Sequence, residues 1–520
     1  MALAIRLSRR TGAAVLAGVT AAIGLAGALG MPAAAQESGT SGKPLYVALV
    51  WHMHQPYYKD PARGVYMLPW VRMHAVKDYY DMAAMLREFP QMRATFNLVP
   101  SLLLQLDDYV RNGAKDLYQI VTEKPAAELT AQEKAFILRR FFDANHDHII
   151  RRYPRYWELL QKRGTTGSDA EIQAAMERFV EQDYRDLQVW FNLAWIDVDL
   201  VRTDPQLSAL VAKGRDFTEA DKRAVLDEHL AIMRDVVGVY RDLMASGQIE
   251  VTTTPFYHPI LPLVLNTDSA RIASPSIQLP RHRYAQPGDV EAQLQAAVES
   301  YRRHFGRDPE GLWPPEQAVG QDMVTFVASA GFRWMVSSEG VLEKSLGIQL
   351  RGSAREMVRP ADLYQPYWVS AGGRRVAVFF RDIVLSDKIG FAYSGMPARQ
   401  AVDDFVAYLH EMQRVLAQAP GDHVVTVALD GENAWEWYEN DGKDFLRGLY
   451  GALATDPRAT AGDGIGLLEG SPAYPDDPAP VDGLLDRRQP GDLDRRGRGK
   501  PRLGVPLRGS HRHGALRGAA

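Results

Sequence analysis

Short apolar runs that end in polar or aromatic residues recur along the chain. The segment "KPLYVALVWHMHQPYY" begins with the run Leu45–Val50 and then changes to His, Gln, Pro and Tyr, and "MRATFNLVPSLL" holds a second run over Thr95–Val99. Similar runs occur in "GQIEVTTTPFYHPILPL", "GLWPPEQ", "RWMVSSEGVL", "VAVFFRDIVLSDKIGF" and "HVVTVALDGENAWEW". Uninterrupted apolar strands of this kind are typical of a parallel sheet that is covered on both faces.

Helical patterns separate these runs. Between about residues 105 and 247, segments such as "AFILRRFFDANHDHIIRRYPRYWELL" and "KRAVLDEHLAIMRDVVGVYRDLM" place apolar residues at i, i+3, i+4 and i+7. This stretch predicts an inserted helical layer. Elsewhere strands and helices alternate, with the polar residues at the carboxyl ends of the strands, which favours a barrel-like β/α fold of the TIM type. An open doubly wound sheet is the alternative.

Composition excludes several kinds of function. The 520 residues allow one to three domains, and 60 Lys and Arg against 64 Asp and Glu leave a net charge of -4, which gives no reason to expect a nucleic-acid partner. The chain has no cysteine, so thiol catalysis, disulfides and Cys-ligated zinc are excluded.

The N-terminus resembles an export signal. Arg6, Arg9 and Arg10 precede the small-residue apolar stretch Gly12–Gly30, and Ala33-x-Ala35 offers a cleavage site. Residues 1–35 are therefore predicted to be a signal peptide, with an uncleaved signal anchor as the alternative. We expect a mature protein that is exported, to the periplasm or beyond the cell. No later segment is apolar for long enough to span a membrane.

Two carboxylates are candidates for catalysis. Asp430 directly follows a strongly apolar strand, and Glu316 follows Trp313 and two prolines at the end of another. Paired acids with nearby Trp and Tyr suit the cleavage of a glycosidic bond, because one acid protonates the leaving oxygen while the other attacks or activates water. The alternative for each acid is a structural role, capping a helix or pairing with an arginine.

Three histidines form a second candidate cluster. His52 and His54 lie two residues apart on one strand, so their imidazoles point to the same side, and His258 lies at the end of another strand. This arrangement suits hydrogen bonds to sugar hydroxyl groups or a metal ion. A satisfied structural histidine is the alternative for any one of them.

Four segments, in order, resemble signature regions of the family 57 glycoside hydrolases: "WHMHQPYY", "GQIEVTTTPFYHPILPL", "GLWPPEQAV" and "VALDGENAWEWY". The resemblance implies a retaining enzyme that acts on α-glucans without a cofactor or catalytic metal. It also implies an incomplete (β/α)7 barrel, which we place at residues 36–458.

The resemblance also implies roles for individual residues. Glu316 matches the nucleophile and Asp430 the general acid/base, and a retaining mechanism requires their carboxyl groups to lie about 5–5.5 Å apart. The remaining candidates are substrate-binding residues: His52, His54, His258, Trp313, Asp387, Glu432 and Trp435. Two other functions remain open. One is a metal-dependent glycan hydrolase, similar to family 38 α-mannosidases or polysaccharide deacetylases, with zinc on His52, His54 and an Asp. The other is a non-catalytic glycan-binding protein.

The C-terminal stretch, residues 459–520, does not fit this pattern. Residues 481–520 hold nine Arg and one Lys among many Gly and Pro, a composition typical of a disordered tail. Yet "GLLDRRQPGDLDRRGRGKPRLGVP", moved by one base, can be translated as a Trp- and Glu-containing string that resembles the fifth family region. We therefore predict a frameshift from about residue 459, a poorly packed tail, and the loss of most of a helical C-terminal part.

Overall fold

Seven parallel strands form the centre of the molecule. The computed structural model describes residues 43–470 and residue 485, so the predicted signal peptide and most of the predicted tail lie outside the described residues. Neighbouring strands pair in parallel throughout, and the single bridge Thr253–Leu312 closes the ring between β5 and β6. The expected barrel is confirmed. In order around it, the strands are β1 (Leu45–Met53), β4 (Ala94–Leu98), β5 (Ile249–Thr252), β6 (Gly311–Leu312), β7 (Trp334–Ser338), β9 (Arg374–Arg381) and β10 (His423–Asp430).

The apolar strands supply two separate cores. Along β1, Ala48 and Val50 belong to the cluster inside the barrel, whereas Val47, Leu49 and Trp51 belong to the larger cluster beneath the helices. Successive side chains of a strand point to opposite faces, so a strand that is covered on both sides must be apolar at nearly every position. This explains the uninterrupted runs in the sequence.

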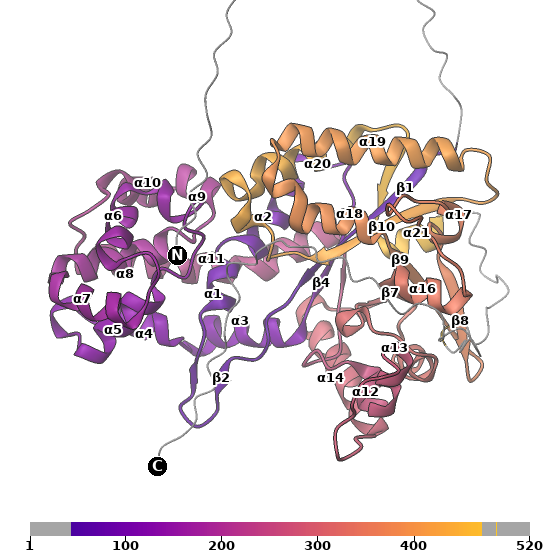
Figure 1. Ribbon diagram of the computed structural model, residues 1–520, viewed down its shortest axis with the longest axis horizontal. Helices are drawn as coiled ribbons and strands as arrows, with labels where there is room; N and C mark the ends of the chain where they lie inside the picture. Colours follow the sequence, from indigo (N-terminus) through magenta and orange to yellow (C-terminus); the bar gives the residue numbers. More distant parts are fainter. Residues whose placement is uncertain (1–42, 471–484, 486–520) are drawn as a thin grey trace, which may run out of the picture. The chain divides into compact units, whose positions relative to one another are not determined.

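Nine helices lie between β4 and β5 and form the group on the left of Figure 1. The longest, α11 (Glu219–Ala245), begins at a capping box in which Thr218 and Asp221 bond to each other's backbone, and its buried face packs against α8 and α2. The others are α3 (Pro100–Asn112), α4 (Leu117–Glu123), α5 (Ala131–Arg140), α6 (Pro154–Arg163), α7 (Asp169–Arg178), α8 (Glu181–Leu193), α9 (Val198–Thr203) and α10 (Pro205–Lys213).

The other elements surround the strands (Figure 1). An antiparallel strand, β8 (Tyr367–Ala371), pairs with β9, and a short hairpin joins β2 (Lys59–Asp60) to β3 (Val65–Tyr66). The remaining helices are α1 (Trp70–Ala75), α2 (Asp78–Ala84), α12 (Leu261–Leu265), α13 (Ala270–Ala273), α14 (Pro287–Phe305), α15 (Val324–Ser329), α16 (Glu339–Leu346), α17 (Pro360–Leu363), α18 (Ile383–Asp387), α19 (Ala398–Leu416) and α20 (Lys443–Thr455).

Packed structure continues beyond residue 458. The strand β11 (Ala459–Gly462) pairs in parallel with Leu45–Ala48 of β1, and α21 (Gly464–Gly470) follows it. Leu467 and Leu468 join the cluster inside the barrel, so α21 covers the amino ends of the strands. The prediction of poor packing from residue 459 is therefore wrong for residues 459–468, and the frameshift itself stays a prediction.

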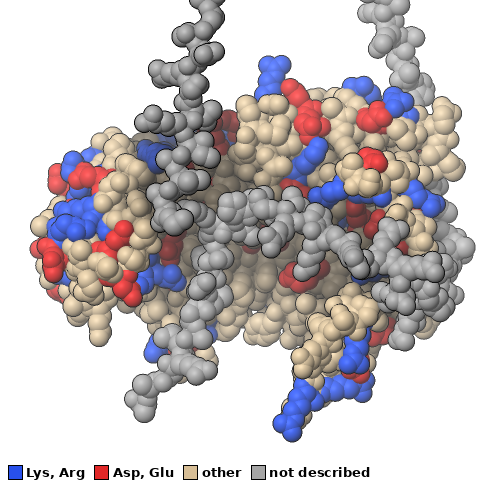
Figure 2. All heavy atoms as spheres, in the orientation of Figure 1, with Lys and Arg blue, Asp and Glu red and all other residues tan. Residues whose placement is uncertain are grey.

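The surface of the described residues is mixed in charge. In Figure 2 basic and acidic side chains are interspersed over the visible face, in keeping with the small net charge. Within residues 43–470, no helix combines the length and the apolar character needed to cross a membrane.

Candidate active site

The carboxyl ends of four strands bring the predicted residues to one mouth of the barrel. His52 lies near the end of β1 and His54 directly follows the strand. His258 follows β5, Glu316 follows β6, and Asp430 is the last residue of β10. His52 and Asp430 are direct partners in neighbouring strands, and the next residue, Gly431, donates its N–H to the His52 carbonyl at 2.8 Å. Parallel strands thus gather residues that lie far apart in the sequence.

The three imidazoles form a compact group. The ring centroids of His54 and His258 lie 4.1 Å apart, those of His52 and His258 4.9 Å, and those of His52 and His54 5.4 Å. One nitrogen from each ring lies within 4.8 Å of the other two. The predicted meeting of these three side chains is thus seen in the structure.

Hydrogen bonds determine which nitrogen of His52 carries its proton. The Asn97 amide nitrogen donates to Thr252 Oγ1 at 3.2 Å, so its carbonyl oxygen faces His52 Nδ1 at 2.6 Å. That oxygen can only accept, so His52 Nδ1 carries the hydrogen and Nε2 keeps a lone pair. The indole of Trp313 stacks on one face of the His52 ring, with centroids 4.3 Å apart and planes at 6°.

The same logic applies to His258. Thr254 Oγ1 donates its hydrogen to the Trp313 carbonyl at 2.7 Å, so it can only accept from His258 Nδ1, which lies 3.2 Å away. The lone pair of His258 Nε2 therefore points toward Glu316, whose Oε1 lies 3.8 Å away. Two acceptors face each other across this gap, and a group that donates hydrogen bonds or a cation would satisfy both.

Burial keeps the three rings uncharged. It lowers the pKa of His54 to about 4, and burial together with the neighbouring His54 lowers the pKa of His258 to about 3. Burial, followed by the other two imidazoles, holds the pKa of His52 well below its usual value, although the bond to Asn97 acts in the opposite direction. At neutral pH the cluster therefore consists of neutral rings.

Glu316 sits on a strained turn. Pro314 is extended (φ −64°, ψ 131°), and Glu316 itself is left-handed, with φ 55° and ψ 18°. His258 is also left-handed, at φ 58°. Such a conformation costs an ordinary L-residue about 1–2 kcal/mol, and residues of this kind cluster at functional sites. The turn presents the carboxylate to solvent, since the Glu316 side chain is 71% exposed.

Two acids, Asp430 and Glu432, lie at the carboxyl end of β10, and they differ in their exposure to solvent. Asp430 is exposed, and its Oδ2 accepts a hydrogen bond from the Asn433 amide at 3.0 Å. Although part of the side chain is exposed, the surrounding protein desolvates the carboxyl group and raises the pKa of Asp430, while Asn433 and Arg381 act to lower it. Glu432 is only 3% exposed, and burial together with the charge of Asp430 raises its pKa well above the usual value. A sugar can reach Asp430 but not Glu432, which instead accepts a bond from the His54 backbone.

Three other predicted residues have different settings. Trp435 is 1% exposed and packs edge-on against Trp51, and Trp313 is 4% exposed behind His52. The prediction that Trp313 and Trp435 bind the substrate needs correction, because in this structure both indoles are buried and support the site from within the core. Asp387 accepts a hydrogen bond from Arg355 at 3.1 Å. Burial lowers the pKa of Arg381, and the charges of Asp387 and Asp430 only partly oppose this lowering.

Sequence reasoning missed the residues that orient the imidazoles. Asn97 and Thr254 were not singled out, although each is a polar residue in or directly after a buried strand. That position is itself a usable signal, because a buried polar side chain requires a partner. Asn433, the hydrogen-bond donor to Asp430, was also missed.

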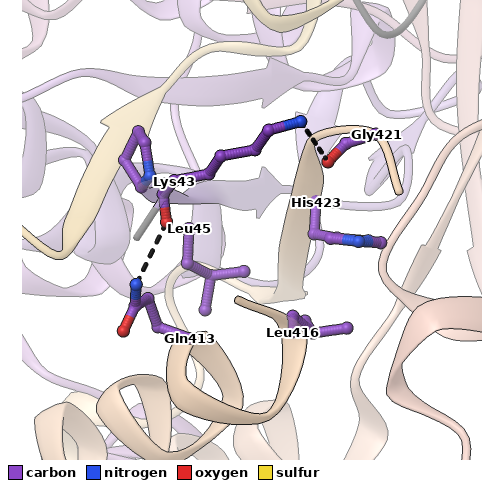
Figure 3. A pocket seen from close by; sticks show the side chains of 7 residues that line it. Lys43, Leu45, Gln413, Leu416, Gly421 and His423 are labelled. Atoms are coloured by element: carbon purple, nitrogen blue, oxygen red, sulfur yellow. Dashed lines mark hydrogen bonds between the residues drawn. The ribbon is translucent and has the colours of Figure 1, made fainter. Parts of the chain in front are cut away.

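A small pocket at the opposite end of β1 has no such chemistry (Figure 3). Lys43 Nζ donates to the Gly421 carbonyl at 3.3 Å, and Gln413 Nε2 donates to the Lys43 carbonyl at 3.1 Å. These bonds hold the start of β1 to α19 and to the loop before β10. The lining residues are Lys43, Pro44, Leu45, Gln413, Leu416, Gly421 and His423.

Known proteins resemble part of this chain. A 1,4-alpha-glucan branching enzyme of Thermococcus kodakarensis is 26% identical over 190 residues, 34% of this chain and 25% of that protein. An alpha-amylase of Pyrococcus abyssi is 22% identical over 229 residues, 43% of this chain and 28% of that protein. The matched regions thus span little more than a quarter of these relatives.

A solved structure and a family description extend the comparison. The branching-enzyme structure from Thermococcus kodakaraensis aligns with a TM-score of 0.47 and 15% identity, over 84% of this chain and 72% of that one. The description "Glycosyl hydrolase family 57" matches residues 48–460, which include all the site residues described above. The chain belongs to glycosyl hydrolase family 57.

Proposed function

We propose that the protein is a retaining glycoside hydrolase or transglycosidase that acts on α-glucans, with Glu316 as nucleophile and Asp430 as general acid/base. The observation that carries this proposal is the meeting of two solvent-accessible carboxylates and three neutral imidazoles at one barrel mouth. The names of the relatives, branching enzyme and alpha-amylase, support an α-glucan substrate.

The proposed reaction has two displacements. Glu316 attacks the anomeric carbon while Asp430 gives its proton to the glycosidic oxygen, so that a C–O bond forms to the enzyme as the bond to the leaving sugar breaks. Asp430 then removes a proton from water or from a sugar hydroxyl, which attacks the same carbon and releases Glu316. The raised pKa of Asp430 suits its first role as an acid near neutral pH.

The imidazoles would bind the sugar. Nε2 of His258 carries a lone pair and can accept a hydrogen bond from a sugar O–H. His52 is only 3% exposed, as buried as Glu432, and contacts the other two rings instead. A hydroxyl between His258 and Glu316 would fill the gap between their facing acceptors. Neutral rings are suited to this task because they keep their acceptor sites at neutral pH.

Product analysis on amylose, pullulan and glycogen tests the proposal. We expect α-configured products, followed by NMR before the anomers equilibrate, and no turnover by Glu316→Gln. Products of inverted configuration, or full activity in that variant, would refute the double displacement. Binding of glucan without turnover by the unaltered chain would identify a glycan-binding protein instead.

A zinc-dependent glycan hydrolase is the second candidate, favoured by the three clustered imidazoles. It predicts that a chelator abolishes activity, whereas the double displacement survives chelation. Export remains part of our proposal, and fractionation of cells that express the full chain would test it.

A further inference from the structure

We propose that His52, His54 and His258 form a chelating site for a divalent transition-metal ion such as Zn²⁺, and that the ion inhibits the enzyme by occupying the sugar site. The binding half stands on the geometry of the cluster alone. The inhibitory half rests on the proposed glycosidase function. Such a site differs from a catalytic zinc centre, because removal of the ion would activate the enzyme.

The distances are close to those of a metal site. Zinc binds histidine nitrogen at about 2.0–2.1 Å, and in tetrahedral geometry this places two ligand nitrogens about 3.4 Å apart. The three candidate nitrogens already lie within 4.8 Å of one another. A contraction of at most about 1.4 Å is needed, and rotation of the His54 and His258 rings can supply it.

Two of the rings are already held as metal ligands usually are. A ligating histidine commonly donates its other N–H to a fixed acceptor, which orients the lone pair toward the metal. His52 Nδ1 has this bond to Asn97 at 2.6 Å, and His258 Nδ1 has it to Thr254 at 3.2 Å. Both Nε2 lone pairs are therefore available without a change of tautomer.

The nucleophile would complete the coordination. Glu316 Oε1 lies 3.8 Å from His258 Nε2, so an ion on the imidazoles can take this carboxylate as a fourth ligand. The ion would then occupy the space of a sugar hydroxyl and engage the attacking group. Imidazole ligands favour Zn²⁺, Cu²⁺ or Ni²⁺ over Mg²⁺ and Ca²⁺, so the effect should be selective.

Titration calorimetry with Zn²⁺ and the full chain, without glucan, tests the binding half. We expect one high-affinity Zn²⁺ per chain and an affinity at least about tenfold weaker in His54→Gln and in His258→Gln. The control His282→Gln, at an exposed histidine outside the site, should leave the affinity unchanged. Absorption of Co²⁺ in the visible range gives a second measurement, with an intense tetrahedral spectrum expected only when the three histidines are intact.

Unchanged Zn²⁺ affinity in both site variants, with circular dichroism confirming that they fold, would overturn the site. Glucan turnover then tests the inhibitory half. Zn²⁺ should inhibit, higher glucan concentration and EDTA should each relieve the inhibition, and Mg²⁺ or Ca²⁺ should have no effect. Zinc binding without inhibition of an active enzyme would refute this half, whereas a chain without glucan activity would leave the calorimetric result standing.

Discussion

The two ends of the barrel each hold a carboxylic acid with a raised pKa, in opposite settings. At the carboxyl ends of the strands, Asp430 is exposed and accepts one hydrogen bond, from Asn433. At the amino ends, Glu250 is buried, with one oxygen accepting from Trp334 Nε1 and the other from the Ile465 N–H, both at 2.9 Å. Burial raises the pKa of Glu250 to about 8.

This difference shows why a raised pKa alone does not identify a catalytic acid. Both carboxyl oxygens of Glu250 accept hydrogen bonds, and α21 covers this end of the barrel. Glu250 therefore has a structural role: it stabilises the amino ends of the strands. Asp430 is exposed, can donate or accept a further hydrogen bond, and is the strand partner of His52 at the barrel mouth. Access and unmet hydrogen-bonding capacity, added to the pKa, separate a site from a structural contact.

The strongest test of the contrast between a catalytic and a structural end of the barrel is Glu316→Gln, at the carboxyl ends of the strands. We expect kcat to fall by about 10⁴-fold or more, because the amide cannot attack the anomeric carbon. The free energy of unfolding should change by no more than about 0.5 kcal/mol, since the side chain is largely exposed. Steady-state kinetics and denaturant unfolding measure the two quantities, and a large loss of stability would contradict the assignment.

Asp430→Asn should have the next largest effect. Loss of general acid/base catalysis is expected to lower kcat by about 10²–10⁴-fold. A substrate with an activated leaving group, such as an aryl glycoside, needs less protonation, so its cleavage should suffer less. An equal loss on natural and activated substrates would argue that Asp430 has another role.

At the amino ends of the strands, Glu250→Ala should lower the free energy of unfolding and not the activity. It leaves the Trp334 and Ile465 N–H groups without their acceptor, which we expect to lower the free energy of unfolding by about 3 kcal/mol. Activity per folded molecule should change little. Glu469→Ala, at the exposed end of α21, removes only a surface pair with Arg333 and should cost at most about 1 kcal/mol.

The pH dependence of stability gives the same variant a second readout. Because the pKa of Glu250 is about 8 in the folded state and about 4.5 when unfolded, the folded protein holds a proton that the unfolded chain releases. This contribution to stability is present below about pH 4.5 and is lost as the pH rises toward 8. Unfolding curves of Glu250→Ala should lack that decline, and an identical decline in both proteins would show that another group causes it.

Thr254→Val tests the support of His258. The substitution keeps the shape but removes the acceptor for Nδ1–H, so the ring is no longer held in one tautomer. We expect kcat/KM per folded molecule to fall about tenfold, equivalent to about 1.4 kcal/mol. The free energy of unfolding should fall by about 1–3 kcal/mol, because the Trp313 carbonyl also loses its donor in the core. An unchanged kcat/KM would mean that the bond does not position the imidazole.

The smallest expected effect is a pH shift in Asn433→Ala. The Asn433 amide stabilises the ionised form of Asp430, so its removal should raise the pKa of that carboxyl further. Asp430 then stays protonated to higher pH, and the alkaline limb of the kcat profile should move upward. A shift to lower pH would contradict the direction assigned to this bond.

The barrel and the position of its mouth were predictable because both follow from local patterns. Apolar runs that end in polar residues mark the strands and their carboxyl ends, and a parallel sheet brings those ends together. The burial of Trp435 was not predictable in this way. Its neighbours Trp51 and Phe445 come from other parts of the fold, and an indole beside an acid has the same sequence signature whether it faces a sugar or the core.

The strand β11 was missed for a related reason. "ATAG" has too few large apolar residues to predict a strand, and it is held by its pairing with β1. Gly464 shows the same dependence on distant contacts, since a Cβ there would lie 2.3 Å from the Trp334 ring. The pairing of β11 with β1 and the packing of Gly464 on Trp334 exist only in the assembled barrel, so the local sequence does not predict them.

The partners of β1 also determine when the barrel can close as the chain is made. Among the strands in residues 43–470, β1 is synthesised first and its neighbours β10 and β11 last, and Leu45 pairs with both His423 and Ala459. Until then one side of an apolar strand has no partner, a state that favours pairing with other chains. Closing a loop of this length is also slow. We therefore expect completion of the barrel to be a late, post-synthetic step that benefits from a chaperone.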